Sequence, residues 1–195
     1  RTEIAELGEF GLIDELTKGA TTSNKRTLCG VGDDAAVIDL GDEALLLTTD
    51  MLTEGIDFDL SYFPLKHLGY KVIVRGVNDI LAMNAKPEQV VVALGVSAKI
   101  SVEALDELYE GMEHAAKELG VDIVGGDTTA SMNGLVITIT AMGRTKKSDI
   151  VYRSGAKEHD LICITSNLGA AYMGLHLLER EKRVLKDIEN PEPKF

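Results

Sequence analysis

Acidic residues at the ends of apolar segments are the candidates for chemistry in this sequence. Asp33 and Asp34 follow a Gly-Val-Gly turn, Asp50 ends the apolar run LLLTTD, and Asp127 ends the run DIVGGD; Asp79 lies within the apolar segment VNDILAM. Charged side chains are rarely buried unless they are paired or bound to a metal. Carboxylates that converge repel one another unless cations neutralise them, and such oxygen ligands suit Mg²⁺ bound to substrate phosphates. The pattern therefore indicates a magnesium-dependent site that binds phosphate groups.

Each acidic residue taken alone also has an ordinary structural explanation. An isolated Gly-Asp-Asp is typical of a turn, an Asp after a strand is typical of a strand end or a helix cap, and Asp79 fits a solvated helix position. The segment Gly-Gly-Asp at 125–127 is more specific, because two glycines allow a phosphate to approach the backbone closely. Thr48 and Thr49 place further oxygen atoms beside Asp50. The hypothesis depends on the combination of these motifs.

Other devices for phosphate or acid–base chemistry are absent from the sequence. It has no GxxxxGK[ST] loop, no GxGxxG between a strand and a helix, no HRD or DFG set and no HExxH. Metal ions would therefore neutralise the charge that a P-loop lysine neutralises elsewhere, and no side chain is assigned as a catalyst. Arg144 and Arg153 are the best cationic candidates for phosphate contact, although a surface role fits each equally well.

The composition excludes several classes of partner. The net charge is −12 with no basic stripe, which disfavours binding to nucleic acid or to an anionic membrane. No apolar run approaches the roughly 20 residues of a membrane helix. Cys29 and Cys163 form no CxxC or Cys/His cluster, so zinc is not expected. Two sparse cysteines are typical of reduced thiols in a cytoplasmic protein, which is the location we expect.

Helices and strands alternate with short connections, which predicts an α/β (α+β) fold with a mixed sheet packed with helices. Ser101 is expected to cap one of the helices, which would end near Gly120. The predicted helices cover 9–18, 64–83 and 101–120, and the predicted strands cover 44–49, 89–97, 121–124 and 135–142.

The chain changes character after residue 152. A strand at 160–165 and a helix containing Met173 and Leu177 are expected to open a second α/β domain. About 40 residues are too few to fold alone. We therefore predict a first domain at 1–152, an incomplete second domain at 153–195, and a longer native protein.

Six segments form an ordered set of motifs along the chain: GEFGLI at 8–13, GVGDDAAV at 30–37, TTDMLTEG at 48–55, NDILAMNAKP at 78–87, VGGDTT at 124–129 and RSGAK at 153–157. Together they resemble the thiamine-monophosphate kinase family of the aminoimidazole ribonucleotide synthetase-like superfamily. The resemblance implies the N-terminal domain fold of that superfamily and transfer of the ATP γ-phosphoryl group to thiamine monophosphate. It also implies several Mg²⁺ ions, no covalent intermediate, and a homodimer formed through the domain at 1–152, which would bind ATP and Mg²⁺.

The resemblance also implies roles for individual residues. Asp57 stands where the family often has a His that contacts the thiamine substrate, and a carboxylate there would meet the cationic thiazolium. Tyr109 is a nucleotide candidate for which a core aromatic role is the alternative. The implied metal ligands are Asp34, Thr48, Thr49, Asp50, Asp79 and Asp127, and the implied nucleotide contacts are Gly126, Asp127 and Arg153.

Two alternatives remain open at this stage. One is another member of the superfamily, such as a selenophosphate synthetase, which needs a reactive Cys or selenocysteine ahead of the GDD segment; Cys29 adjoins that segment and fits poorly. The other is a non-catalytic nucleotide-binding domain that only dimerises. The family's remaining metal and substrate groups would lie beyond Phe195, so we expect the 195 residues alone to be inactive.

Overall fold

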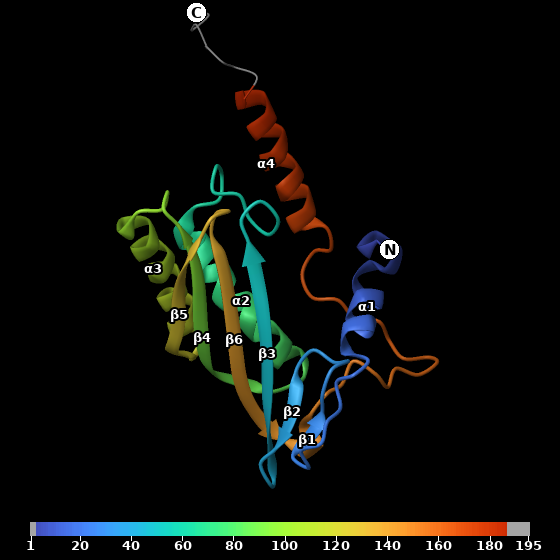
Figure 1. Cartoon of the computed structure of the whole chain (residues 1–195). Helices are drawn as coiled ribbons and strands as arrows, with labels where there is room; N and C mark the ends of the chain where they lie inside the picture. Colours follow the sequence, from blue (N-terminus) through green and yellow to red (C-terminus); the bar gives the residue numbers. More distant parts are fainter. Residues whose placement is uncertain (1–2, 187–195) are drawn as a thin grey trace, which may run out of the picture.

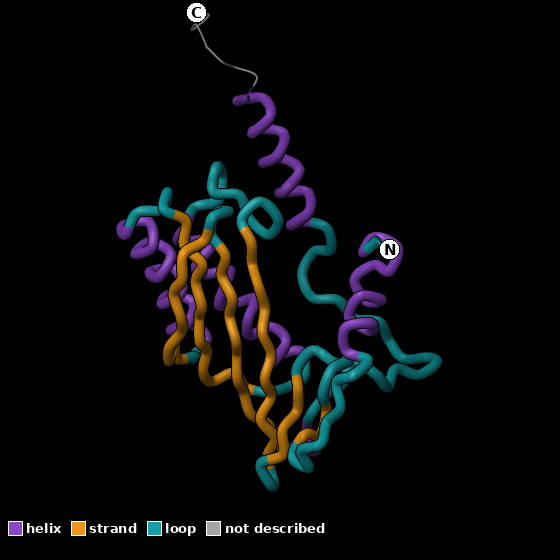
Figure 2. The backbone as a smooth tube through the Cα atoms, viewed as in Figure 1, coloured by secondary structure: helices purple, strands orange, loops and turns teal. Residues whose placement is uncertain are grey.

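A six-stranded mixed sheet forms the centre of the computed structural model, which describes residues 3–186 (Figures 1 and 2). The strand order is β1-β2-β3-β6-β4-β5. β4 and β5 are parallel and every other neighbouring pair is antiparallel, which confirms the predicted mixed sheet. The strands are β1 (Thr27–Cys29), β2 (Ala36–Asp39), β3 (Glu43–Thr53), β4 (Lys86–Ser97), β5 (Asp122–Ser131) and β6 (Val136–Lys146).

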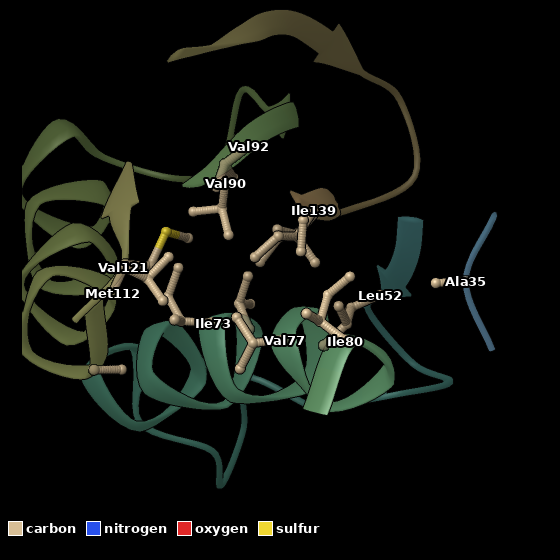
Figure 3. Packing of buried hydrophobic residues seen from close by; sticks show 14 of the residues in the cluster. Ala35, Leu52, Ile73, Val77, Ile80, Val90, Val92, Met112, Val121 and Ile139 are labelled. Carbon is tan, nitrogen blue, oxygen red and sulfur yellow. The ribbon is translucent and has the colours of Figure 1, made fainter. Parts of the chain in front are cut away.

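Two long helices, α2 (Leu65–Ala82) and α3 (Val102–Leu119), cover one face of the sheet. Figure 1 shows both behind the strands, and none of the described helices lies on the near face. Strand residues alternate between the two faces, so Leu46 and Leu52 are fully buried under α2 while Met51 is 57% exposed on the open face. Figure 3 shows the core between the sheet and these helices. Burial of this apolar layer is the main stabilising contribution.

Two glycines allow α2 and α3 to pack closely. A Cβ at Gly69 would lie 1.9 Å from the backbone oxygen of Leu108, and one at Gly111 would lie 1.9 Å from that of Lys66. α3 begins where expected, since the Ser101 hydroxyl accepts a hydrogen bond from the Ala104 N–H at 3.2 Å. It ends at Gly120, whose φ of 67° suits a residue without a Cβ. The helix that carries Asp79 is thus packed directly against the backbone of α3.

The strand predicted at 160–165 is wrong. These residues lie in an irregular segment between the short 3-10 turn η1 (Lys147–Asp149) and helix α4 (Ala170–Lys186). Leu161 and Ile162 are 90% and 97% exposed. An apolar run becomes a buried strand only beside partner strands, and none of the six described strands pairs with it.

The first helix, α1 (Ile4–Thr17), begins earlier than predicted and is interrupted at Gly8, where φ is 66°. The strand predicted at 121–124 extends to Ser131, because β5 pairs with β4 along its whole length. Among residues 3–186, no helix combines the length and apolar composition that crossing a membrane requires. The segment NPEPKF at 190–195 lies outside the described residues, and the division into 1–152 and 153–195 stays a prediction.

Candidate phosphate and metal site

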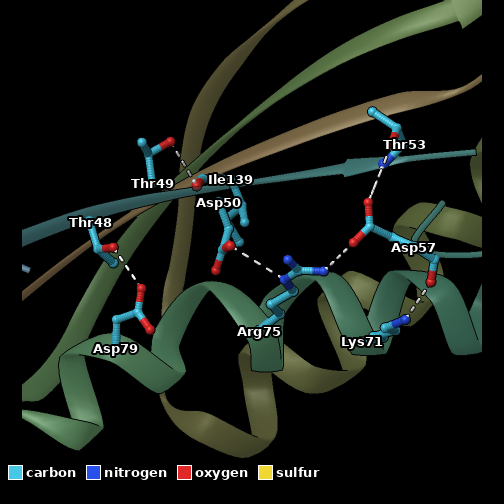
Figure 4. Close-up of polar contacts among 9 residues, drawn as sticks. All are labelled: Thr48, Thr49, Asp50, Thr53, Asp57, Lys71, Arg75, Asp79 and Ile139. Carbon is cyan, nitrogen blue, oxygen red and sulfur yellow. Dashed lines mark hydrogen bonds and ion pairs between the residues drawn. The ribbon is translucent and has the colours of Figure 1, made fainter. Parts of the chain in front are cut away.

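Strand β3 and helix α2 bring three of the predicted oxygen donors together. Thr48 and Asp50 alternate with outward-facing residues of β3 and therefore point toward α2, on the same face as the buried Leu46. On α2, Asp79 precedes the buried Ile80. The Thr48 hydroxyl donates a hydrogen bond to Asp79 Oδ2 at 2.8 Å (Figure 4). The sheet–helix packing thus places hydroxyl and carboxylate oxygens in one region.

The surroundings of Asp79 are unfavourable for the charge of its carboxylate. Burial raises its pKa above the ordinary value of 3.8, and the negative charges of Asp50 and Asp34 raise it further. The hydrogen bond from Thr48 and the charge of Arg153 act in the opposite direction. A bound cation would relieve this repulsion, as expected for a metal site.

The turn that carries Asp33 and Asp34 is joined to Arg153, which lies about 120 residues further along the chain. The Arg153 guanidinium pairs with the Asp34 carboxylate, and the Arg153 backbone N–H donates to Asp33 Oδ2 at 3.1 Å. The pairing raises the pKa of Arg153. These residues line a groove of about 1470 Å³ whose walls include Phe10 of α1 and Thr48. The groove therefore has an apolar wall, a guanidinium and carboxylates, which is a composition that suits a nucleotide phosphate and its counter-ions.

Asp127 is not brought next to these residues within one chain. In the sheet register it stands in one row with Ala93, Thr138 and Met51. β5 lies three strands from β3, which is about 14 Å at the usual strand spacing. The row containing Met51 faces the open side of the sheet, whereas Asp50 faces α2. Asp127 thus lies on the other face of the sheet from Asp50.

Three further residues named from the sequence also differ in position from the cluster around Asp79. Thr49 faces the open side, where the hydroxyl of Thr140 donates to its Oγ1 at 3.0 Å. A Cβ at Gly126 would lie 1.8 Å from the Val92 backbone oxygen, so close strand packing alone requires glycine there. Tyr109 packs against the hydrophobic core, as in the alternative role given for it above.

Arg144 does not contact the groove. Its guanidinium pairs with Glu88 at 2.8 Å and approaches Glu43 at 3.8 Å. Its sheet partner is Leu45, five residues along β3 from Asp50, and five residues span about 17 Å of strand. Arg144 therefore belongs to an ion-pair cluster at the far end of the sheet, which matches the surface role given above as the alternative to phosphate contact.

The donor chemistry of the cluster fits Mg²⁺. Asp34, Thr48, Asp50 and Asp79 offer only hard oxygen ligands, and Mg²⁺ typically uses one or two carboxylates with substrate phosphates. Across residues 3–186, no three His, Cys, Asp or Glu side chains are close enough to form a complete ion site by themselves. The fit is thus to an ion shared with a phosphate ligand rather than to a closed protein cage.

Arg75 is a site residue that the sequence reasoning missed. Its Nε lies 3.3 Å from Asp50 Oδ1 and its Nη1 lies 2.6 Å from Asp57 Oδ1 (Figure 4). Burial opposes ionisation of Asp57, but hydrogen bonds from the Thr53 N–H and from Arg75 outweigh burial and lower the pKa of Asp57. No local sequence pattern pairs Arg75 with Asp50 or Asp57, because the helix, the strand and the loop are separate segments of the chain.

Asp57 also borders a second cavity, of about 740 Å³, between the 54–63 loop and α4. Aromatic side chains line much of it, including Phe58, Phe63 and Tyr172. Tyr62 donates a hydrogen bond to Glu179 at 2.7 Å, which joins the loop to the helix. The cavity is mostly apolar with acidic groups at its edge, and such a lining suits a flat organic cation.

Residues 32–145 match the family AIR synthase related protein, N-terminal domain, which covers more than half of the chain. The chain therefore belongs to this family. The match contains the Asp34 turn, β3 and Asp79, so it includes the residues that the sheet and α2 bring together.

Among known proteins, the chain resembles thiamine-monophosphate kinases. It is 33% identical to that of Bacillus subtilis over 90% of this chain and 54% of the relative. It is also 33% identical to that of Aquifex aeolicus, over 95% of this chain and 58% of the relative. A solved structure described as AaThiL complexed with AMPPCP and TMP superposes with a TM-score of 0.83 at 32% identity, covering 99% of this chain and 57% of that one. The chain thus spans just over half the length of these relatives.

Proposed function

We propose that the chain supplies the ATP- and Mg²⁺-binding part of a kinase that phosphorylates thiamine monophosphate to thiamine diphosphate. The observation that carries the proposal is the meeting of Thr48, Asp50 and Asp79 beside the groove that holds Asp34 and Arg153. The likeness to a structure bound to AMPPCP and TMP supports the same assignment.

In this proposal the γ-phosphoryl group passes directly and in line to the acceptor. Asp34, Thr48, Asp50 and Asp79 would hold Mg²⁺, which supplies neutralisation of the phosphate charge. Arg153 would exchange its contact with Asp34 for a phosphate oxygen, since a guanidinium binds carboxylate and phosphate by the same bidentate geometry. We also propose that the reaction takes place in the cytoplasm.

The acceptor would enter from the 740 Å³ cavity beside Asp57. The Asp57 carboxylate is held ionised, which suits the positive charge of a thiazolium. Phe58 and Tyr172 offer apolar faces to its rings. The acceptor phosphate would then point toward β3. Asp50 of that strand is linked to Asp57 by Arg75, which contacts both carboxylates.

A second copy of the chain gives a role to the residues on the open sheet face. Met51 is 57% exposed there, and Thr49 and Asp127 face the same side. A homodimer formed through this face would bury the apolar strand residues, as dimer interfaces do. It would also place Thr49 and Asp127 close to groups of the partner subunit, which is how we propose that these two residues join the site.

Cys29 does not support the selenophosphate alternative. The thiol is half-buried, and burial followed by the charge of Asp33 raises its pKa. A thiol in such surroundings is a weak nucleophile.

The test is a phosphotransfer assay on the full-length native protein with thiamine monophosphate, ATP and Mg²⁺. Chromatography should show thiamine diphosphate formed in proportion to the ADP released, and Asp50→Asn should abolish it. Release of ADP without thiamine diphosphate would refute the acceptor, and turnover unchanged by Asp50→Asn would refute the site.

A further inference from the structure

Arg75 joins two carboxylates that come from different parts of the chain. Asp50 belongs to β3 and Asp57 to the loop that follows it, and the guanidinium contacts both, at 3.3 Å and 2.6 Å (Figure 4). The side chains of Asp50 and Asp57 are only 23% and 18% exposed. A planar guanidinium can bridge two acceptors in this way, whereas a lysine ammonium acts as a point charge and is less suited to hold both.

The bridge also fixes the backbone around Asp57. The second carboxylate oxygen of Asp57 accepts the Thr53 N–H at 2.8 Å, and Lys71 Nζ donates to the Asp57 backbone oxygen at 2.7 Å. The Asp57 carboxylate therefore receives bonds from α2 on one side and from the end of β3 on the other. Since this loop forms one wall of the 740 Å³ cavity, the position of that wall depends on Arg75.

The same guanidinium places a positive charge beside Asp50. A cation that binds Asp50 must approach this charge, so Arg75 weakens cation binding while it strengthens the loop. Removing the charge of Arg75 should therefore have two opposite effects: it should strengthen cation binding at the strand and loosen the loop that carries Asp57. A residue with a merely structural role would not produce effects of opposite sign.

We propose that Arg75 is a positioning residue that sets the acceptor-side loop against the cation-binding strand and at the same time limits the affinity for Mg²⁺. The proposal rests on the function proposed above. It adds a link between the two halves of the site, made through one guanidinium.

The test compares Arg75→Met with Arg75→Lys in the full-length protein, and Arg144→Met serves as the matched control, because Arg144 also pairs with carboxylates but lies at the far end of the sheet. Steady-state kinetics give kcat and the KM for thiamine monophosphate, and calorimetry gives the Kd for Mg²⁺ without substrates. Hydrogen exchange measures the amides at 53–57.

For Arg75→Met we expect the KM for thiamine monophosphate to rise about tenfold, which corresponds to the loss of one charge-assisted hydrogen bond. The change in kcat should be much smaller. The Kd for Mg²⁺ should fall about threefold, and amides at 53–57 should exchange faster. Arg75→Lys should keep the Mg²⁺ affinity of the original protein but still raise the acceptor KM. Arg144→Met should change none of these quantities.

An unchanged acceptor KM with unchanged exchange at 53–57 in Arg75→Met would overturn the proposal, as would weaker Mg²⁺ binding. If Arg75→Met does not fold, Arg75→Lys decides, since a normal acceptor KM there would equally overturn it. If the unaltered protein forms no thiamine diphosphate, the proposed function fails, while amide exchange and Mg²⁺ calorimetry still test the bridge separately.

Discussion

Replacing Asp79 by Asn should stabilise the protein when no divalent cation is present. The carboxylate is partly buried near Asp50 and Asp34, and its pKa is raised by burial and then by those charges. Asn has the same shape and keeps an oxygen that accepts the Thr48 hydroxyl, now 2.8 Å from Asp79. The substitution therefore removes the repulsion and retains the hydrogen bond.

The gain should be about 1 kcal/mol in the free energy of unfolding at pH 7, which is typical of repulsion between partly solvated charges. For a chain of this size it corresponds to a Tm about 2–4 °C higher. The sign of the pH dependence follows from linkage. Because the folded pKa of Asp79 lies above its ordinary value of 3.8, the charged form costs stability above the folded pKa, and this cost disappears as the pH falls to 3.8. The advantage of Asn should therefore vanish in acid.

Urea denaturation in EDTA from pH 7 to pH 4 measures this difference, with Asp122→Asn at an exposed position as the control. The control should stay within about 0.5 kcal/mol of the original protein. Excess Mg²⁺ should stabilise the original protein more than Asp79→Asn. A variant clearly less stable than the original at pH 7, or a difference independent of pH, would show that Asp79 is not under electrostatic stress.

Three further perturbations test the packing, the α4 contact and the acceptor side. Gly69→Ala should lower the unfolding free energy in urea by about 2 kcal/mol through overpacking against α3, and Gly174→Ala, which has open space, should not; equal effects would contradict the close helix contact. The hydrogen bonds from Lys182 and from Ser61 lower the pKa of Asp59 to about 2. The stabilisation that the Lys182–Asp59 pair contributes is therefore complete above pH 3.8 and is lost as the pH falls to about 2. The protection of the α4 amides against hydrogen exchange, corrected for the intrinsic rate at each pH, should fall over that range, and constant protection would refute the contact. Asp57→Ala should raise the KM for thiamine monophosphate about tenfold while the KM for ATP is unchanged, and an equal loss for both would contradict its acceptor role.

Local sequence patterns predicted most of the fold because they act over short distances. The 3.6-residue period of the apolar side chains predicted helix α2, and Ser101 and Gly120 predicted the two ends of α3. The exposed run at 160–165 was misread because apolar composition alone cannot say whether a partner strand exists. Pairing of β5 with β4 to Ser131 is likewise a non-local property.

The candidate site was predictable in its residue types but less so in its arrangement. The convergence of Thr48, Asp50 and Asp79 could be predicted, because the alternation of side chains on a strand and their periodicity on a helix follow directly from the sequence. The distance of Asp127 from them depends on strand order, in which β6 and β4 stand between β3 and β5. Arg75 was missed because ion pairs between distant segments have no short-range signature.

The central claim is that the carboxylates near Asp79 bind a nucleotide together with Mg²⁺. Calorimetric titration of the 195-residue chain with AMPPCP, with and without Mg²⁺, tests it most directly, with Asp50→Asn in parallel. We predict binding that requires Mg²⁺ and that Asp50→Asn weakens by at least about tenfold. Binding of equal strength in EDTA, or in Asp50→Asn, would contradict the account.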